Sequence, residues 1–234
     1  MIIKVCGLCN TDNARAVAGV GVDMIGFCFM PQSERYVSMI SSHSGLLPDY
    51  SEERMKSVRT ADGKDEAELS MPKRVGVFAD DMPQNIVTRI YNYKLDYVQL
   101  NGEELPLMID NLRRTLVPDI NPEIKIIKTI QVERAEDFSL CDQYRDVVDM
   151  FLFTGKQSSA YATGSKFDWS LLNAYQGDVP FLLGGGISVD DTDAILQIKH
   201  AKFAGIDINE SFEKAVGEKD IDMLVGFVNK LKQR

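Results

Sequence analysis

The chain has 234 residues, of which 44% are apolar and 26% are charged. This composition is ordinary for a folded globular protein and excludes collagen-like and disordered chains. No apolar run reaches the roughly 18 residues that a membrane helix needs, and the N-terminal segment lacks the layout of a signal peptide. We therefore expect a cytoplasmic protein with no membrane contact.

The net charge argues against one class of partner. The chain carries 26 basic and 35 acidic side chains, so its formal net charge is −9. Because such a field repels polyanions, we expect no nucleic-acid partner. A small phosphorylated ligand is compatible with this charge, since glycine-rich backbone and helix N-termini bind a phosphate group locally.

Apolar, strand-like runs alternate with amphipathic segments along the chain. We predict eight strands, at Ile2–Cys6, Met24–Met30, Arg74–Ala79, Tyr97–Asn101, Lys125–Val132, Met150–Thr154, Pro180–Gly184 and Lys202–Ile208. We predict seven helices, at Asp12–Ala18, Pro83–Tyr93, Glu104–Leu116, Ala135–Arg145, Phe167–Tyr175, Asp190–Ile198 and Asp220–Leu231. Most strands are continuously apolar, which is typical of parallel strands covered by helices. This alternation favours an α/β fold, a single (β/α)8 TIM barrel over residues 1–234, rather than an open doubly wound sheet.

One stretch breaks the alternation. Between the second and third predicted strands, residues 41–72 are polar and irregular, and they form an insertion within the predicted domain. Within it, Ser51–Glu68 alternates charge signs and has few apolar residues. We interpret the insertion as a surface segment that the fold tolerates, with a regulatory or partner-binding segment as the alternative.

The barrel fold nominates candidate residues before any family is considered, because barrel enzymes place their chemistry at the carboxyl ends of the strands. The residues at these ends are Cys6, Asp80, Asn101, Thr154, Gly184–Gly186 and Asp207–Glu210. The three glycines can bind a phosphate with their backbone amides or can simply make a tight turn. Cys6 can act as a base or nucleophile, or can be an inert buried thiol. Arg35, in the loop after the second strand, can reach toward an anion at the barrel mouth.

The spacing of Cys6 and Cys9 also allows a zinc site or a redox pair. A zinc site would need further ligands, but the two histidines of the chain, His43 and His200, do not stand in a paired spacing. We therefore predict no metal site and expect reduced, partly buried thiols.

Several segments of the chain carry a family resemblance. They read IIKVCGL, DMIGFCFMPQSERYVS, KRVGVFAD, LDYVQLNGEE, GSKFDW, PFLLGGGIS and AGIDINESFE. In their order and spacing, these segments resemble the phosphoribosylanthranilate isomerases of tryptophan biosynthesis. The resemblance spans nearly the whole chain except the insertion.

The resemblance implies a (β/α)8 isomerase that needs neither a metal nor an organic cofactor. The family's reaction is the Amadori rearrangement of N-(5-phosphoribosyl)anthranilate to 1-(2-carboxyphenylamino)-1-deoxyribulose 5-phosphate. In it, a general acid protonates the furanose oxygen and a general base removes the proton at C2. On this chain, the resemblance assigns the base to Cys6, the anthranilate contact to Arg35 and the phosphate contact to Gly185 and Gly186. Asp207 matches the aspartate that ends the eighth strand.

The chain departs from the family at the barrel mouth. Thr154 stands where the family has its general-acid aspartate, and a threonine hydroxyl cannot deliver a proton near neutral pH. Asn101 replaces a histidine and keeps a polar amide for substrate binding, while Glu210 replaces a small hydroxyl residue near the phosphate. Gly184 replaces a serine, and the loop after the sixth strand lacks the family's double glycine.

These departures leave three hypotheses open. The first is a phosphoribosylanthranilate isomerase, either impaired at the acid step or rescued by another carboxyl group such as Asp80, Asp207 or Glu103. The second is an inactive or repurposed paralogue that binds a different small ligand at the barrel mouth. The third is a different enzyme on the same barrel. We expect a phosphorylated sugar–anthranilate substrate for the first, and either a monomer or a homodimer.

Overall fold

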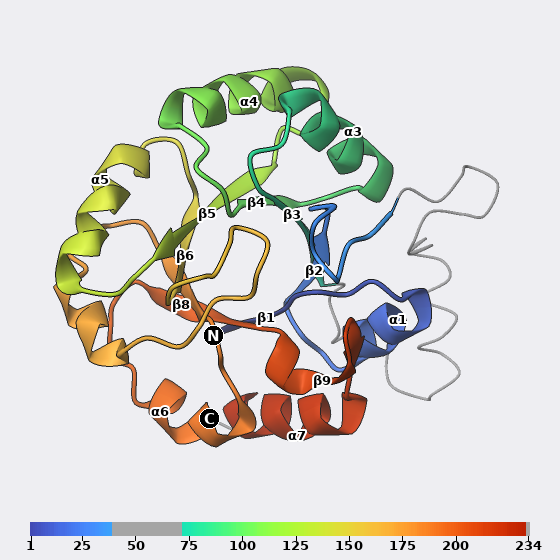
Figure 1. Cartoon of the computed structure of the whole chain (residues 1–234), viewed down its shortest axis with the longest axis vertical. Coiled ribbons are helices and arrows are strands. Elements are labelled where there is room, and N and C mark those ends of the chain that lie inside the picture. Colours follow the sequence, from blue (N-terminus) through green and yellow to red (C-terminus); the bar gives the residue numbers. More distant parts are fainter. Residues whose placement is uncertain (39–71, 233–234) are drawn as a thin grey trace.

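The structure, a computed structural model, describes residues 1–38 and 72–232. Within these residues, eight parallel strands close into a barrel in chain order, and helical segments surround it (Figure 1). The strands are β1 (Ile2–Val5), β2 (Met24–Cys28), β3 (Lys73–Phe78), β4 (Tyr97–Leu100), β5 (Lys125–Gln131), β6 (Met150–Thr154), β7 (Phe181–Gly184) and β8 (Phe203–Ile208). The barrel closes because β8 pairs with β1, from Ile2 opposite Gly205 to Val5 opposite Ile208. The predicted TIM barrel is confirmed.

The apolar runs form strands because both faces of a parallel barrel strand are buried. Every residue of β2, β4, β6 and β7 is buried. One apolar cluster, which includes Met24, Ile127, Leu152 and Leu182, fills the barrel, and a larger one packs between the strands and the helices. A filled interior leaves room for a ligand only above the strand ends.

The helical segments have recognisable starting signals. The α-helices are α1 (Thr11–Gly19), α3 (Pro83–Tyr93), α4 (Pro106–Asp119), α5 (Cys141–Tyr144), α6 (Thr192–Leu196) and α7 (Ile221–Lys232). The short 3-10 helices are η1 (Ala135–Leu140), η2 (Trp169–Ala174), η3 (Val189–Asp191) and η4 (Glu210–Phe212). Asn10 caps α1 by accepting hydrogen bonds from the backbone of Asp12 and Asn13. A proline in the first turn, which has no N–H to leave unpaired, begins α3 and α4.

Three of the predicted helices are helical in the structure but consist partly or wholly of 3-10 turns. These segments are Ala135–Arg145, Phe167–Tyr175 and Asp190–Ile198. Their buried side chains recur every third residue, as at Phe138 and Cys141 or at Leu172 and Tyr175. This spacing fits a helix with three residues per turn as well as an α-helix, so periodicity over one or two turns does not separate them.

A short hairpin after β8 was not predicted. It consists of β9 (Glu213–Ala215) and β10 (Glu218–Lys219), which pair antiparallel before α7 begins. The side chain of Asn13 in α1 anchors it, accepting from the backbone nitrogen of Lys219 and donating to its carbonyl oxygen. The predicted insertion at 41–72 lies outside the described residues apart from Pro72. None of the described helices has the length and apolar character needed to cross a membrane.

Candidate active site

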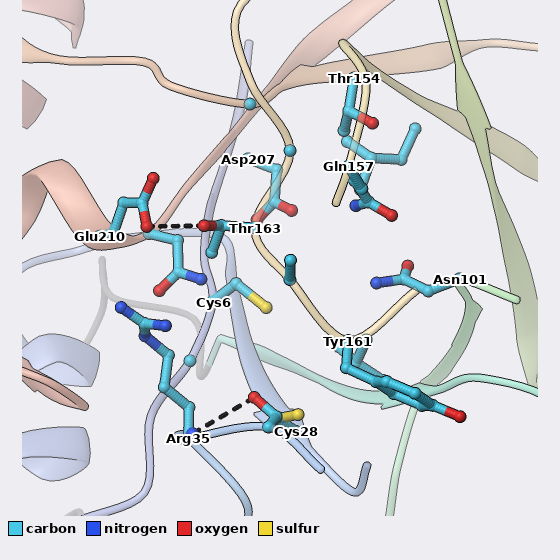
Figure 2. A pocket seen from close by; sticks show the side chains of 18 of the residues that line it. Cys6, Cys28, Arg35, Asn101, Thr154, Gln157, Tyr161, Thr163, Asp207 and Glu210 are labelled. Atoms are coloured by element: carbon cyan, nitrogen blue, oxygen red, sulfur yellow. Dashed lines mark hydrogen bonds between the residues drawn. The ribbon is translucent and has the colours of Figure 1, made fainter. Parts of the chain in front are cut away.

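A pocket lies at the carboxyl ends of the barrel strands (Figure 2). The space between its lining residues amounts to about 700 Å³ when the solvent at its open side is included. All of the site residues assigned from the sequence line it: Cys6, Arg35, Asn101, Thr154, Gly185, Gly186 and Asp207. Segments from opposite ends of the chain, such as those of Cys6 and Asp207, meet here because all parallel strands of a barrel end on the same face.

Cys6 lies directly after β1, at the floor of the pocket. Its backbone nitrogen donates to the carbonyl oxygen of Ile208 at 2.9 Å, which fixes the residue against β8. The side chain packs in a small apolar cluster with Cys28 and Val77, beneath Tyr161. Burial raises the pKa of the Cys6 thiol, and the positive charge of Lys4 opposes that rise. The thiol is therefore close to a cation that favours its thiolate form.

Asp207 forms a buried ion pair beside Cys6. Its Oδ1 accepts a hydrogen bond from Lys4 Nζ at 2.9 Å, and the Lys4 side chain is fully buried while 11% of the Asp207 side chain is exposed. Burial raises the pKa of Asp207, and the charge of Lys4 opposes this effect. The pair places a carboxyl group and an ammonium group next to the thiol.

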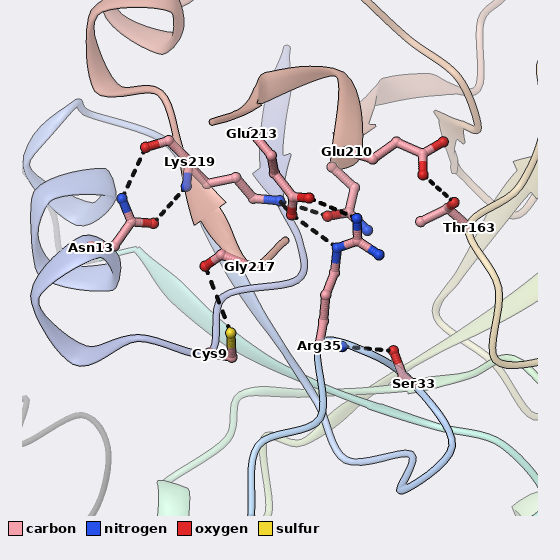
Figure 3. Close-up of polar contacts among 10 residues, drawn as sticks. Cys9, Asn13, Ser33, Arg35, Thr163, Glu210, Glu213, Gly217 and Lys219 are labelled. Atoms are coloured by element: carbon pink, nitrogen blue, oxygen red, sulfur yellow. Dashed lines mark hydrogen bonds and ion pairs between the residues drawn. The ribbon is translucent and has the colours of Figure 1, made fainter. Parts of the chain in front are cut away.

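Arg35 is held by a charged network that reaches the β9–β10 hairpin (Figure 3). Its Nε and Nη2 donate to the two carboxylate oxygens of Glu213 at 2.9 and 2.6 Å. Lys219 Nζ donates to Glu213 Oε1 and to Asn209 Oδ1, each at 2.6 Å. A Cβ atom on Gly7 would lie 2.6 Å from Arg35 Cδ, so only glycine allows this close approach. Two cations against one carboxylate leave this network with a net positive charge.

The wall opposite Arg35 carries polar side chains with unused hydrogen-bonding capacity. Asn101 Oδ1 accepts from Gln99 Nε2 at 2.8 Å and from Thr129 Oγ1 at 2.6 Å. Among the described residues, Thr154 Oγ1, Gln99 Oε1 and Gln157 Oε1 are buried and have no hydrogen-bond partner. Buried polar atoms of this kind are normally satisfied by water or a ligand. This wall therefore suits a ligand that carries hydroxyl groups.

Gly185 and Gly186, which follow β7 and are called the glycine cradle below, cannot be replaced by other residues without strain. Gly185 and Gly186 have φ angles of 84° and 61°, which side chains rarely adopt. A Cβ atom on Gly185 would lie 2.3 Å from the carbonyl oxygen of Ser165 in the loop after β6. Ser188 and Asp191 form a capping box directly after the two glycines, so the turn that follows them begins at Ser188.

Glu210 lies at the rim of the pocket and is exposed. Its Oε2 accepts a hydrogen bond from Thr163 Oγ1 at 2.6 Å, which ties the β8 end to the loop after β6 (Figures 2 and 3). The partner of this carboxylate is therefore a neutral hydroxyl group and not a cation.

Asp80 and Glu103 do not line the pocket, so they are poor candidates for a replacement acid. Asp80 has a φ of 50°, and its Oδ1 accepts from the backbone nitrogen of Glu103 at 2.7 Å. The turn thus uses the carboxylate to link the β3 and β4 ends.

The two cysteines of the C-x-x-C spacing point to different places. Cys6 faces the pocket, while Cys9 Sγ donates to the carbonyl oxygen of Gly217.

Sequence reasoning missed several residues that shape the pocket, namely Gln99, Gln157, Tyr161 and Thr163, and the supporting pair Glu213 and Lys219. Gln99 belongs to a buried strand, where a polar residue among apolar neighbours was an available signal. The partners of Arg35 had no such signal, because 178 residues separate Arg35 from Glu213.

An open pocket above a filled barrel, lined by residues from the strand ends, places the chain in the class of (β/α)8-barrel proteins with a binding site at the carboxyl face. The family model described as N-(5'phosphoribosyl)anthranilate (PRA) isomerase matches residues 3–230. The chain belongs to this family, as its motifs indicated.

The relatives of the chain carry the same description. It is 37% identical to the N-(5'-phosphoribosyl)anthranilate isomerase of Parabacteroides distasonis, over 99% of this chain and 93% of the relative. It is 35% identical to that of Phocaeicola vulgatus, over 100% of this chain and 99% of the relative. The solved phosphoribosyl anthranilate isomerase of Thermotoga maritima is similar with a TM-score of 0.70 and 26% identity, with 100% of both chains covered. These comparisons lend no support to an inactive or repurposed paralogue.

Proposed function

We propose that this chain catalyses the isomerisation of N-(5-phosphoribosyl)anthranilate to 1-(2-carboxyphenylamino)-1-deoxyribulose 5-phosphate. The observation that carries the proposal is the convergence of Cys6, Arg35, Asp207 and the Gly185–Gly186 cradle on one pocket, in a chain of this family. The substrate has a phosphate at one end and a carboxylate at the other. The pocket offers a glycine cradle for the first and a guanidinium for the second.

Cys6 is the proposed general base. Once the furanose ring has opened to the iminium, the Cys6 thiolate removes the proton at C2, and the electron pair of the C–H bond forms the enolamine. The nearby ammonium of Lys4 stabilises the thiolate against the burial that raises the pKa of the thiol. The scheme needs no metal and no organic cofactor, because each step is a proton transfer between a side chain and the substrate.

Arg35 is the proposed contact for the anthranilate carboxylate. Glu213 occupies Nε and Nη2 of the guanidinium, and no described residue accepts a hydrogen bond from Nη1. Arg35 Nη1 can therefore donate to the substrate carboxylate. The net positive charge of the network formed by Arg35, Glu213 and Lys219 favours an anion at this end of the pocket.

The sugar is proposed to lie between these two anchors. Asn101 and Asp207 face it from opposite sides, and Gly185 and Gly186 hold its phosphate with their backbone amides. Thr154 occupies the position of the family's acid, where its hydroxyl can only donate or accept a hydrogen bond. We expect a cytoplasmic monomer or homodimer without a nucleic-acid partner, in keeping with the acidic charge.

A growth test examines this proposal in a cell. Expression of the chain in a bacterium that lacks its own phosphoribosylanthranilate isomerase should restore growth without tryptophan, and the Cys6→Ala variant should fail to do so. Growth restored by neither protein at matched expression would count against the proposal. Equal growth with both would show that Cys6 is not the base.

Substitution of Gly185 tests the phosphate cradle. In Gly185→Ala the new methyl group collides with the Ser165 carbonyl at a positive φ, so we expect KM to rise at least about tenfold and stability to fall by about 1 to 3 kcal/mol. Steady-state kinetics and thermal unfolding measure both. Gly226→Ala is the matched control, because its methyl group enters open space on the exposed side of α7. An unchanged KM in Gly185→Ala would remove the cradle from the binding site.

Removing the charge of Glu210 should lower KM, in contrast to the substitution of Gly185. Because its carboxylate places a negative charge at the mouth of a site proposed to bind a phosphorylated substrate, Glu210→Gln should lower KM by about threefold to tenfold. Glu218→Gln removes the same charge from the exposed hairpin and serves as the control. A higher KM in Glu210→Gln alone would mean that this carboxylate helps to bind the substrate.

A further inference from the structure

We infer that Asp207 is the general acid of this chain, taking the role that Thr154 cannot perform. This inference rests on the proposed function, because a proton donor is needed only if the furanose ring opens in this pocket. Three observations support it: the carboxyl groups that reach the pocket, the absence of a side chain at Gly184 beside Asp207, and the pairing with Lys4, which leaves the second carboxylate oxygen without a donor.

The first observation is that the described pocket offers few carboxyl groups. Among the residues that the structure describes, the carboxylates that line the pocket are Asp207 and Glu210. Glu210 is exposed at the rim and bonded to Thr163, whereas Asp207 lies deep, beside Cys6. A general acid must reach the same sugar ring as the base, and Asp207 meets this requirement.

The second observation concerns the layer of side chains at the strand ends. Asp207 on β8 pairs with Gly184 on β7. On the opposite edge of β7, Phe153 of β6 pairs with Leu183, so Thr154, the next residue, lies level with Gly184. A Cβ atom on Gly184 would lie 2.9 Å from Leu152 Cδ1 and 3.4 Å from Asp207 Cβ, so the position is closely packed and has no room for a longer side chain. Because Gly184 has no side chain, β7 contributes nothing between Asp207 and the position of the missing acid, and both side chains point into the pocket (Figure 2).

The third observation is the fixed ion pair. Lys4 holds Asp207 Oδ1 at 2.9 Å, while no described residue donates to Oδ2. The free oxygen can carry the proton, and the bonded one faces the ammonium that stabilises the carboxylate once the proton has left. The groups that act on Asp207 are Lys4 on β1 and Lys219 on β10, and burial raises its pKa despite both cations. Burial therefore shifts Asp207 toward its protonated form, while the pairing with Lys4 favours the carboxylate that remains after proton transfer.

The proposed step balances its protons and electrons. The Asp207 carboxyl transfers its proton to the furanose ring oxygen while the bond between that oxygen and C1 breaks, and the bonding pair goes to the oxygen. The lone pair of the anthranilate nitrogen forms the C=N bond of the iminium. Cys6 then removes the C2 proton, and solvent returns Asp207 and Cys6 to their starting protonation states.

A double-mutant cycle tests this assignment, with kcat measured for Asp207→Asn, Thr154→Asp and the two combined. Asparagine is chosen because its side-chain oxygen still accepts from Lys4. We expect Asp207→Asn to lower kcat by about 10² to 10⁴-fold in the wild-type background, and by less than about tenfold when Thr154→Asp supplies another acid. An equal loss in both backgrounds, or a loss below about tenfold in wild type, would overturn the inference.

Two controls keep the test decisive. Asp149→Asn removes an aspartate that is paired with Arg113 at 2.7 Å and lies before β6, outside the pocket, and it should retain kcat. If Asp207→Asn does not fold, the cycle is repeated with Asp207→Ser, whose hydroxyl oxygen can also accept from Lys4 and which likewise has no acidic proton to give. Absence of turnover in the wild-type protein itself would instead reject the proposed function, so the two failures are distinguishable.

Discussion

The Cys6→Ala protein should fold and lose its turnover. Removing the base from the C2 proton transfer is expected to lower kcat by about 10² to 10⁴-fold, to the background of the assay. The cost to stability should stay near 1 kcal/mol, because the substitution removes a single sulfur atom from a site that opens into the pocket. Steady-state kinetics and thermal unfolding on the same preparation separate these two effects.

Cys28→Ala provides the control for this experiment, because Cys28 is a second buried thiol that lines the same pocket. It should keep at least about a tenth of the wild-type turnover, given that general-base catalysis is lost only with the base itself. A Cys6→Ala protein with activity within tenfold of wild type, or a Cys28→Ala protein without activity, would contradict the assignment of the base.

The Thr154→Asp protein should be faster than wild type. An aspartate at the end of β6 adds a carboxyl group at a position that is 3% exposed, where burial raises the pKa and so favours the protonated form. We expect kcat to rise by about tenfold, since a general acid contributes about 10² to 10⁴-fold and Asp207 already supplies most of this.

Thr154→Asn is the matched control, because asparagine has the shape of aspartate without its proton. It should leave kcat at or below the wild-type value. A similar gain in both variants would attribute the effect to shape or hydrogen bonding. An unchanged rate in Thr154→Asp would place the slow step elsewhere.

The barrel was predictable from the sequence because the same pattern, an apolar strand followed by a helical segment, repeats along the chain. Each buried strand is a continuous apolar run, and the fixed handedness and order of strand–helix units leave few alternatives. The connecting helices were less predictable. Around Leu172 and Tyr175, apolar side chains spaced by three residues are compatible with two helix types, and local hydrogen bonding decides between them.

The position of the site was also predictable, because Cys6 and Asp207 end their strands and barrel strands end on one face. The orientation of side chains was not. Asp80 also follows a strand, but a positive φ turns its carboxylate toward the backbone of Glu103. The partner of Arg35 comes from a hairpin that is distant in the chain, and pairing at such a separation leaves no local pattern.

The central claim is that this barrel performs the family reaction with Cys6 as its base. The most direct test is turnover of the purified wild-type protein with phosphoribosylanthranilate generated in situ, followed by the loss of its anthranilate fluorescence, with Cys6→Ala as the blank. We expect clear turnover that depends on Cys6. A wild-type rate no higher than the Cys6→Ala blank, from protein that unfolds cooperatively, would contradict the account.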